Sequence, residues 1–185
     1  MKRKQYSAVF FILLLMFIPT FAVTADDAAV EAFRRNFTRG SLSTKVRVLQ
    51  DSLDYERTDM GPVYMQSLDF IINNYWMLQD DTIGRELMFF TIRLLSTEKV
   101  SESAGDLWQF FNSVEDDELR VALMNAVGNT AVGRNEIIYG INGWLRDYNA
   151  RFKAGDPVDE KLVAETVAAL GKLGDPTSFP IVFTT

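Results

Sequence analysis

Hydrophobic positions recur at helical spacing through almost the whole chain after residue 25. Between residues 42 and 53, for example, Leu42, Val46, Leu49 and Leu53 follow one another at intervals of three or four residues. This spacing places them on one face of an α-helix. No segment shows the alternation of apolar and polar residues that is typical of a half-buried strand. The pattern therefore predicts an all-α protein.

Short polar breaks divide the pattern into helices that we expect to pair as antiparallel hairpins. An N-terminal helix is expected over 26–40. Three hairpins are expected over 42–75, 83–114 and 119–152, and the apolar stripe of a fourth begins at 162. Serine, aspartate and proline stand at the breaks, where they cap or begin helices. Asp156 and Pro157 are expected to begin the first helix of the fourth hairpin, and residues 128–134 are interpreted as an inter-helix turn.

Two glycines interrupt the second helix of the third hairpin. Each of them, Gly140 and Gly143, weakens a helix by about 1 kcal/mol relative to alanine. Two explanations remain at this stage. Either the glycines allow close contact with a neighbouring helix, or the helix begins near Asn142.

Residues 163–183 read VAETVAALGKLGDPTSFPIVF and contain the clearest corner of the chain. Gly174 is expected to end a helix, and Asp175 and Pro176 to begin the next. This stretch looks like the bacterial HEAT-repeat pattern. In that family a helix of small residues ends in Leu-Gly, turns at Gly-Asp-Pro and continues through an apolar residue and a proline, here Phe179 and Pro180.

A repeat becomes visible when first helices are aligned. Residues 119–128 align with 162–171 at an offset of 43, and residues 83–92 align with 119–128 at an offset of 36. Offsets of this size are typical of helical repeat arrays. The resemblance implies an α-solenoid of about four antiparallel hairpins over 41–185, with the last repeat incomplete. The earlier units lack the Gly-Asp-Pro corner, and the alternatives are an irregular helical bundle or tetratricopeptide repeats, whose Trp, Leu-Gly and Tyr spacing is absent.

The first 25 residues have the three parts of a secretory signal peptide. Lys2, Arg3 and Lys4 precede an apolar run over 8–18, and small residues then lead to Ala25. The run is shorter than the roughly 20 residues of a membrane-spanning helix. We therefore predict cleavage after Ala25 and a periplasmic or secreted mature protein that does not sit in a membrane.

The amino-acid composition excludes several kinds of binding and catalytic site. The 185 residues include no cysteine and no histidine, which excludes disulfides, the usual zinc ligand sets and His-dependent nucleophiles. A formal charge of −6 argues against nucleic acid as a partner. No phosphate-binding loop or nucleophile elbow is present, and acidic clusters are interpreted as helix caps rather than metal ligands. We expect no cofactor and no catalysis.

Aromatic side chains that lie away from the apolar stripes are the candidate partner contacts. In the units before the last one, these residues are Trp76, Phe110 and Tyr139. The last unit would leave Phe179, Val182 and Phe183 partly exposed, so that a partner or a second copy of the chain would cover them.

The sequence thus predicts an exported, non-catalytic HEAT-like scaffold that binds another protein. Two alternatives remain. Some bacterial HEAT-like proteins resemble lyases for bilin pigments, which implies a small-molecule or chromophore-binding protein; a large enclosed apolar pocket would favour this alternative. The chain could also be a fragment of a longer repeat protein.

Overall fold

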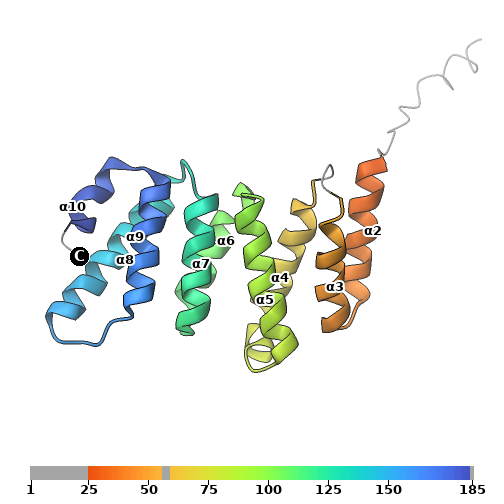
Figure 1. Ribbon diagram of the computed structural model, residues 1–185, viewed down its shortest axis with the longest axis horizontal. Helices are drawn as coiled ribbons and strands as arrows, with labels where there is room; N and C mark the ends of the chain where they lie inside the picture. The colour runs from red at the N-terminus through yellow and green to blue at the C-terminus, as the bar shows by residue number, and fades with distance from the viewer. Residues whose placement is uncertain (1–24, 56–58, 184–185) are drawn as a thin grey trace, which may run out of the picture.

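All the regular structure in the described part of the chain is helical. The computed structural model describes residues 25–55 and 59–183, so most of the predicted signal peptide lies outside the described residues. No strand occurs among the described residues, and the prediction of an all-α protein is confirmed (Figure 1). The elements are α2 (Ala25–Arg39), α3 (Leu42–Ser52), α4 (Gly61–Leu78), α5 (Thr82–Thr97), η1 (Ser101–Ser103), α6 (Ala104–Ser113), α7 (Asp117–Thr130), α8 (Asn135–Lys153), α9 (Glu160–Leu173), η2 (Pro176–Ser178) and α10 (Phe179–Val182).

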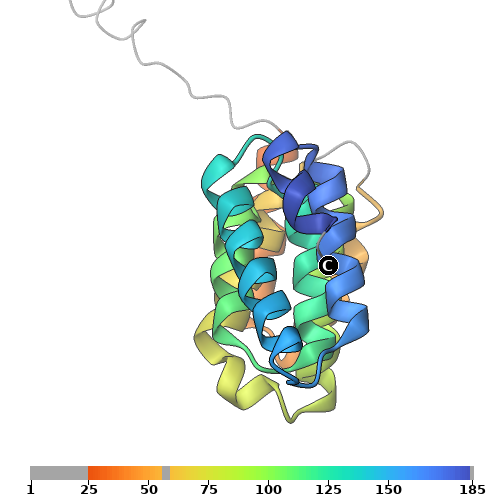
Figure 2. The same cartoon turned by 90° about the vertical axis from the view of Figure 1, so that its left-hand side faces the viewer.

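The long helices lie side by side in two layers (Figures 1 and 2). Helices α3, α5, α7 and α9 form the first layer, and α2, α4, α6 and α8 form the second. The chain changes layer at each connection and reverses its direction, so the helices within a layer run in parallel. In the first layer each helix closely approaches the next, whereas in the second layer only α2 and α4 approach as closely.

The closest pairs of consecutive helices are shifted by one helix from the predicted hairpins. The close pairs are α2 with α3, α4 with α5, α6 with α7, and α8 with α9. The sequence analysis instead paired the helix over 42–53 with the helix over 62–75. It paired the later helices in the same shifted way. That grouping is wrong for the closest contacts, because hydrophobic periodicity identifies the buried face of a helix and not the neighbour which that face meets.

One continuous cluster of buried side chains runs between the two layers, from Phe37 in α2 to Leu173 in α9. Among the described residues, Lys45 of α3 is the one charged side chain that is buried, and it is only 6% exposed. The ammonium group donates a hydrogen bond to the carbonyl oxygen of Phe37 and lies 4.6 Å and 4.7 Å from the ring centroids of Phe37 and Phe70. Burial lowers the pKa of Lys45, and the carbonyl and the two ring faces partly replace water around the charge.

One of the two interior glycines of α8 allows a neighbouring helix to pack closely against it. The helix begins at Asn135, so it does not begin near Asn142. A Cβ atom on Gly140 would lie 2.9 Å from the indole of Trp108 in α6, whereas a Cβ on Gly143 would meet nothing within 4 Å. Gly140 therefore permits close contact between α6 and α8, and Gly143 has no such role.

The first helix of the predicted fourth hairpin begins later than expected. Asp159 caps α9 by accepting a hydrogen bond from the backbone N–H of Leu162 at 3.0 Å. Its own N–H donates to the hydroxyl oxygen of Tyr148 at 2.6 Å. Asp156 instead forms an ion pair, in which its Oδ2 lies 3.4 Å from Nε of Arg151. The predicted cap at Asp156 and Pro157 is therefore wrong, because a contact with α8 fixes the position of Asp159.

The Gly-Asp-Pro corner lies at the end of α9. Gly174 has a φ of +68° and ends the helix, and the Asp175 side chain accepts a hydrogen bond from the N–H of Thr177 at 2.7 Å. Pro176 begins η2. The following helix, α10, is a single turn over Phe179–Val182 that contacts α8. It is shorter than the incomplete second helix that was expected to begin at Asp175 and Pro176.

Replacing Gly174 with alanine should lower the free energy of unfolding by about 1 kcal/mol, because the left-handed backbone disfavours a Cβ atom. The matched control is Gly171→Ala in the same helix, where the backbone is helical and a Cβ would meet nothing within 4 Å. This control should raise the free energy by about 0.5–1 kcal/mol. Urea denaturation followed by circular dichroism measures both, and equal effects would contradict the assigned corner.

Candidate functional site

A groove of about 770 Å³ lies on the first layer, mainly across α5 and α7. Its lining combines partly buried apolar side chains with polar and charged ones. We call it the α5–α7 groove. The residues that line it are Gln50, Glu86, Phe89, Phe90, Ile92, Arg93, Ser96, Thr97, Val121, Ala122, Asn125, Asn129 and Glu165.

Polar contacts at both ends of the groove hold α5 and α7 in register. At one end the Arg85 guanidinium donates to Asp116 at 2.6 Å and to Glu118 at 3.0 Å. At the other end Ser96 contacts both Asn125 and Asn129. Contacts at both ends require the two helices to run in parallel, and they fix the side chains that line the groove between them.

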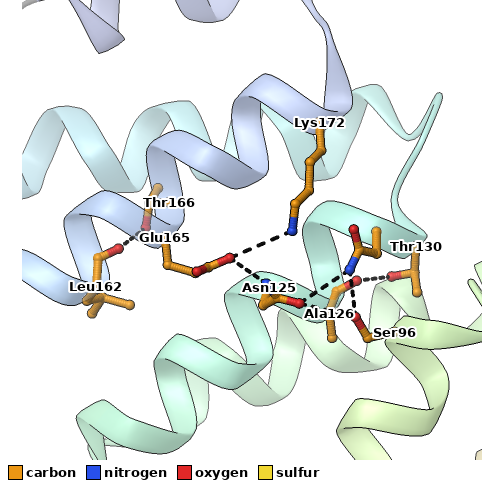
Figure 3. A network of polar contacts seen from close by, with 9 residues as sticks. Ser96, Asn125, Ala126, Thr130, Leu162, Glu165, Thr166 and Lys172 are labelled. Carbon is orange, nitrogen blue, oxygen red and sulfur yellow. Dashed lines mark hydrogen bonds and ion pairs between the residues drawn. The ribbon is translucent and has the colours of Figure 1, made fainter.

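A network of side-chain hydrogen bonds crosses from α5 through α7 to α9 (Figure 3). Ser96 Oγ donates to Asn125 Oδ1 at 3.2 Å and accepts from Asn129 Nδ2 at 2.7 Å. Asn125 Nδ2 donates to Glu165 Oε1 at 2.7 Å. Lys172 lies 3.8 Å from the same carboxylate oxygen. Ser96, Asn125, Asn129 and Glu165 therefore each have their orientation restricted by a hydrogen bond to a neighbouring helix, whereas Lys172 contacts Glu165 within α9.

The apolar lining of the groove includes three half-buried side chains, Phe89, Val121 and Ala122, beside the buried Phe90 and Ile92. The three half-buried side chains pack against the core and still keep an exposed surface. Partly exposed apolar surface next to oriented polar groups is the usual composition of a binding site. The groove can therefore accept an apolar side chain and a hydrogen-bonding group at the same time.

The electrostatics at one end of the groove centre on Asp116. Burial raises the pKa of this carboxyl group, but the hydrogen bond from Arg85 and those from the backbone N–H groups of Leu119 and Glu118 outweigh it and hold the pKa below its usual value. The same contact raises the pKa of Arg85. Asp116 also caps α7, since its side chain accepts from the N–H of Leu119 at 2.9 Å.

Substitutions of Asp116 should distinguish the stability contributed by its helix cap from that contributed by its ion pair with Arg85. Asn caps helices as well as Asp does, so Asp116→Asn should cost about 0.5–1 kcal/mol from the lost ion pair. Asp116→Ala should cost about 1 kcal/mol more. Since the folded pKa lies below the ordinary value of 3.8, the ion-pair contribution is present above that pH and is lost as the pH falls through the folded pKa. Denaturant titrations at neutral and acidic pH test this, and an Asn variant whose deficit persists in acid would contradict it.

A second cavity, of about 570 Å³, lies between the α3–α4 connection and the end of α5. Its lining includes the carboxylates Asp59, Glu98 and Glu102. Burial raises the pKa of Tyr64 in its wall, and the charges of Glu98 and Asp59 add to this, while a hydrogen bond with Ser52 acts in the opposite direction. A phenol with a raised pKa stays protonated at neutral pH, so this wall supplies a hydrogen-bonding hydroxyl and no reactive anion.

One of the predicted partner contacts is buried. Phe110 is only 2% exposed and its ring packs edge-on against that of Tyr75, with centroids 5.4 Å apart. The prediction that Phe110 is an exposed contact is therefore wrong. Helix α6 is covered by neighbours over more of its surface than its apolar stripe indicated.

The other predicted contacts lie on the surface or near it. Trp76 is 73% exposed and Tyr139 is 56% exposed. Phe179 and Phe183 are exposed and stack on each other with centroids 6.3 Å apart, whereas Val182 is half-buried against the core. None of these residues lines the α5–α7 groove, so the structure does not bring the predicted contacts together with it.

Acidic residues at the helix starts act as caps. Asp81 accepts from the N–H of Gly84 at 2.6 Å, and Asp116 and Asp159 cap α7 and α9 in the same way. Among the described residues, no three acidic, histidine or cysteine side chains come together in a group that could hold a metal ion. Within the same ranges, no helix is both long and apolar enough to span a bilayer.

Comparison with known proteins adds no relative. No family model, curated protein or solved structure matches the chain. The likeness to HEAT repeats stays a prediction from the sequence, and the site has to be argued from its geometry.

The sequence analysis did not identify the residues of the groove network. Asn125 and Asn129 interrupt the apolar stripe of α7 at a spacing of four residues, which places them on one face of the helix. Residues 128–134 were interpreted as a turn, but α7 continues to Thr130 and so includes Asn129. The spacing of the two asparagines was the only local signal, and their partners on α5 and α9 lie 29 to 40 positions away.

Proposed function

We propose that this protein is a non-catalytic helical-repeat scaffold that binds another protein through the α5–α7 groove. The observation that carries the proposal is the groove itself. Side chains from α5, α7 and α9 meet there in a fixed network beside the partly exposed Phe89, Val121 and Ala122. Rigid polar groups next to accessible apolar surface are suited to recognising a protein segment.

We propose further that the two layers form an α-solenoid of the HEAT type. The parallel stacking of α3, α5, α7 and α9 supports this arrangement. So do the sequence separations of 29 to 33 between contacting residues of α5 and α7 and of 40 between α7 and α9, which are close to the offsets of the repeat. The repeating unit is then one of the close pairs, such as α4 with α5, and η2 with α10 follows the last pair.

The closer spacing of the first layer supports a binding role for its outer face. Helices that approach more closely on one side of a two-layered array bend the array toward that side. The α5–α7 groove lies on the more closely spaced layer. The proposed solenoid therefore has the groove on its concave face, which is the extended surface that such arrays offer to partners.

A small-molecule site receives less support. Both cavities are open on one side and have mixed polar and apolar linings, whereas a chromophore would favour an enclosed, mainly apolar pocket. A net charge of −6 disfavours nucleic acid, which leaves a protein as the partner class that the surface suits best. We place this activity outside the cytoplasm, after removal of residues 1–25.

Site-specific photocrosslinking tests the proposal. A benzophenone amino acid at Thr97, an exposed residue of the groove, should crosslink one or a few proteins of the native envelope fraction. The same group at Gln109, an exposed residue of α6 in the other layer, is the matched control. Equal yields from the two positions, or none from Thr97, would reject the groove as the binding face.

A further inference from the structure

Helices α7 and α9 follow one pattern. Both are 14 residues long, and their capping aspartates, Asp116 and Asp159, are 43 positions apart. The same offset relates every buried residue of α9 to a buried residue of α7. The pairs are Leu119 and Leu162, Leu123 and Thr166, Ala126 and Ala169, Val127 and Leu170, and Thr130 and Leu173. The two helices therefore turn equivalent faces toward the core.

One side of α7 is covered by α9. A Cβ atom on Gly128 would lie 2.8 Å from the Cα and Cβ atoms of Ala169, and Asn125 donates a hydrogen bond to Glu165 at 2.7 Å. Because of this cover Gly128 is buried and Asn125 is half-buried. On this side α7 therefore accepts a neighbouring helix at very short distance.

The equivalent side of α9 has no such cover. Gly171 and Ala168, which correspond to Gly128 and Asn125, are exposed, and a Cβ atom on Gly171 would meet nothing within 4 Å. Ala164, about one turn before Ala168, is exposed as well. Helix α9 lies at the end of the array that faces the viewer in Figure 2. We call Ala164, Ala168 and Gly171 the outer face of α9.

The contact between α7 and α9 indicates what this outer face can accept. Gly128 meets Ala169 there, so the short distance depends on a small residue from each helix. The outer face of α9 carries small residues at all three positions, and the α9 helix of a second copy would supply the matching ones. At the other end of the array, α3 exposes larger polar and charged side chains, namely Arg47, Gln50 and Asp51. A second copy therefore matches this face through its own α9 and not through its α3.

Charges at the two ends of the outer face select the direction of pairing. Lys161 lies about one turn before Ala164, is exposed, and has no ion pair within the described part of the chain. Asp175 follows the C-terminal end of α9. The two residues lie on opposite sides of Ala168, each about 10 Å from it along the helix axis. Two antiparallel α9 helices that cross at Ala168 bring Lys161 of each copy close to Asp175 of the other, whereas parallel helices would bring lysine to lysine.

We propose that the protein forms a twofold-symmetric dimer in which the outer faces of two α9 helices pack antiparallel and cross at Ala168. The same surface of both copies is used, so the contact closes on itself and does not continue into a filament. The α5–α7 groove is lined mainly by other helices, so the dimer offers two grooves. A partner with two suitable segments would then be held more tightly than by one copy. The dimer itself does not depend on the binding role of the groove.

Single cysteines test the pairing, because the chain has no cysteine of its own. The two copies of Ala168 lie opposite each other in the proposed dimer, so Ala168→Cys should form a disulfide-linked dimer under mild oxidation. The two copies of Ala164 lie about 12 Å apart along the axis, which exceeds the span of a disulfide. Ala164→Cys is therefore the matched control and should give little crosslinked product. Parallel pairing would crosslink both variants equally.

Sedimentation of the unmodified protein measures the association directly. The protein should pass from monomer to dimer as its concentration rises through the micromolar range. Ala168→Arg should remain a monomer, because two long cations would hold the helices apart. Ala28→Arg, at an exposed position of α2, is the control and should dimerise like the parent protein. Circular dichroism checks that both variants are folded, which is expected because both alanines are exposed in one copy.

A charge reversal tests the direction of pairing. Lys161→Glu places glutamate close to Asp175 at both ends of the pair and should weaken dimerisation by about threefold or more. Arg35→Glu changes the net charge equally at an exposed position of α2 and should change the dissociation constant by less than about twofold.

The inference would be overturned by a monomer at all these concentrations, by equal disulfide yields at positions 164 and 168, or by equal effects of the two charge reversals. The dimer and the groove can fail separately. A monomer that still crosslinks from Thr97 would reject the dimer and leave the binding groove, whereas a dimer without that crosslink would reject the groove and leave the dimer.

Discussion

Replacing Phe110 with alanine should lower the free energy of unfolding by about 3–5 kcal/mol. The side chain is only 2% exposed and its ring packs edge-on against Tyr75 of α4. Alanine would remove the apolar surface that Phe110 buries and leave a cavity between α4 and α6. The effect is large because a closely packed interior relaxes only partly into such a space. Urea denaturation followed by circular dichroism measures the loss.

Trp76→Ala is the matched control for Phe110→Ala. Both residues are aromatic, both lie on helices of the second layer and both were predicted to be exposed contacts. Trp76 is 73% exposed, so its replacement should change the free energy of unfolding by less than about 0.5 kcal/mol. Similar losses for the two variants would contradict the burial of Phe110.

Replacing Gly128 with valine should destabilise the protein by about 3 kcal/mol. A Cβ atom on Gly128 would lie 2.8 Å from both Cα and Cβ of Ala169, so the backbones of α7 and α9 would have to move apart. A flexible side chain could rotate away from such a contact, but a backbone atom of a packed helix cannot. Thermal denaturation of the variant should show a clearly lowered midpoint, and the hydrogen bond from Asn125 to Glu165 should be lost as the two helices separate.

Gly143→Val is the control for the helix itself. Gly143 also lies inside a helix, but a Cβ atom there would meet nothing within 4 Å. This variant should be neutral or slightly stabilising, since valine is a better helix former than glycine. Adding Ala169→Gly to the Gly128 variant should restore part of the lost stability, because it removes one of the two atoms in conflict. A Gly128 variant as stable as the Gly143 variant would show that α7 and α9 do not approach as closely as described.

Local chemistry predicted the helices well. Ser41 caps α3 and Asp81 caps α5, and each side chain accepts a hydrogen bond from an N–H three residues later. Gly174 ends α9 with a positive φ. These features depend on groups within a few residues of one another, and such groups are neighbours in space whenever they are neighbours in the chain.

The same local reasoning failed where two neighbouring residues could each cap the helix. Asp156 and Asp159 are both good caps, and the contact between Asp159 and Tyr148 of α8 decided between them. Likewise, an apolar stripe identifies one buried face, but Phe110 is buried by Tyr75 from another helix. Neither partner could be identified from spacing along the chain.

The amino-acid sequence determined the all-α character, the caps at Ser41 and Asp81 and the corner at Gly174, because these follow from interactions over one or two helical turns. The tertiary structure alone decided which helices form close pairs, which aromatic side chains stay exposed and where the α5–α7 groove lies. Those properties depend on contacts such as that between Asn125 and Glu165, which are 40 positions apart. Only the packing of α7 against α9 brings the two side chains within hydrogen-bonding distance, and the groove forms where that packing places them.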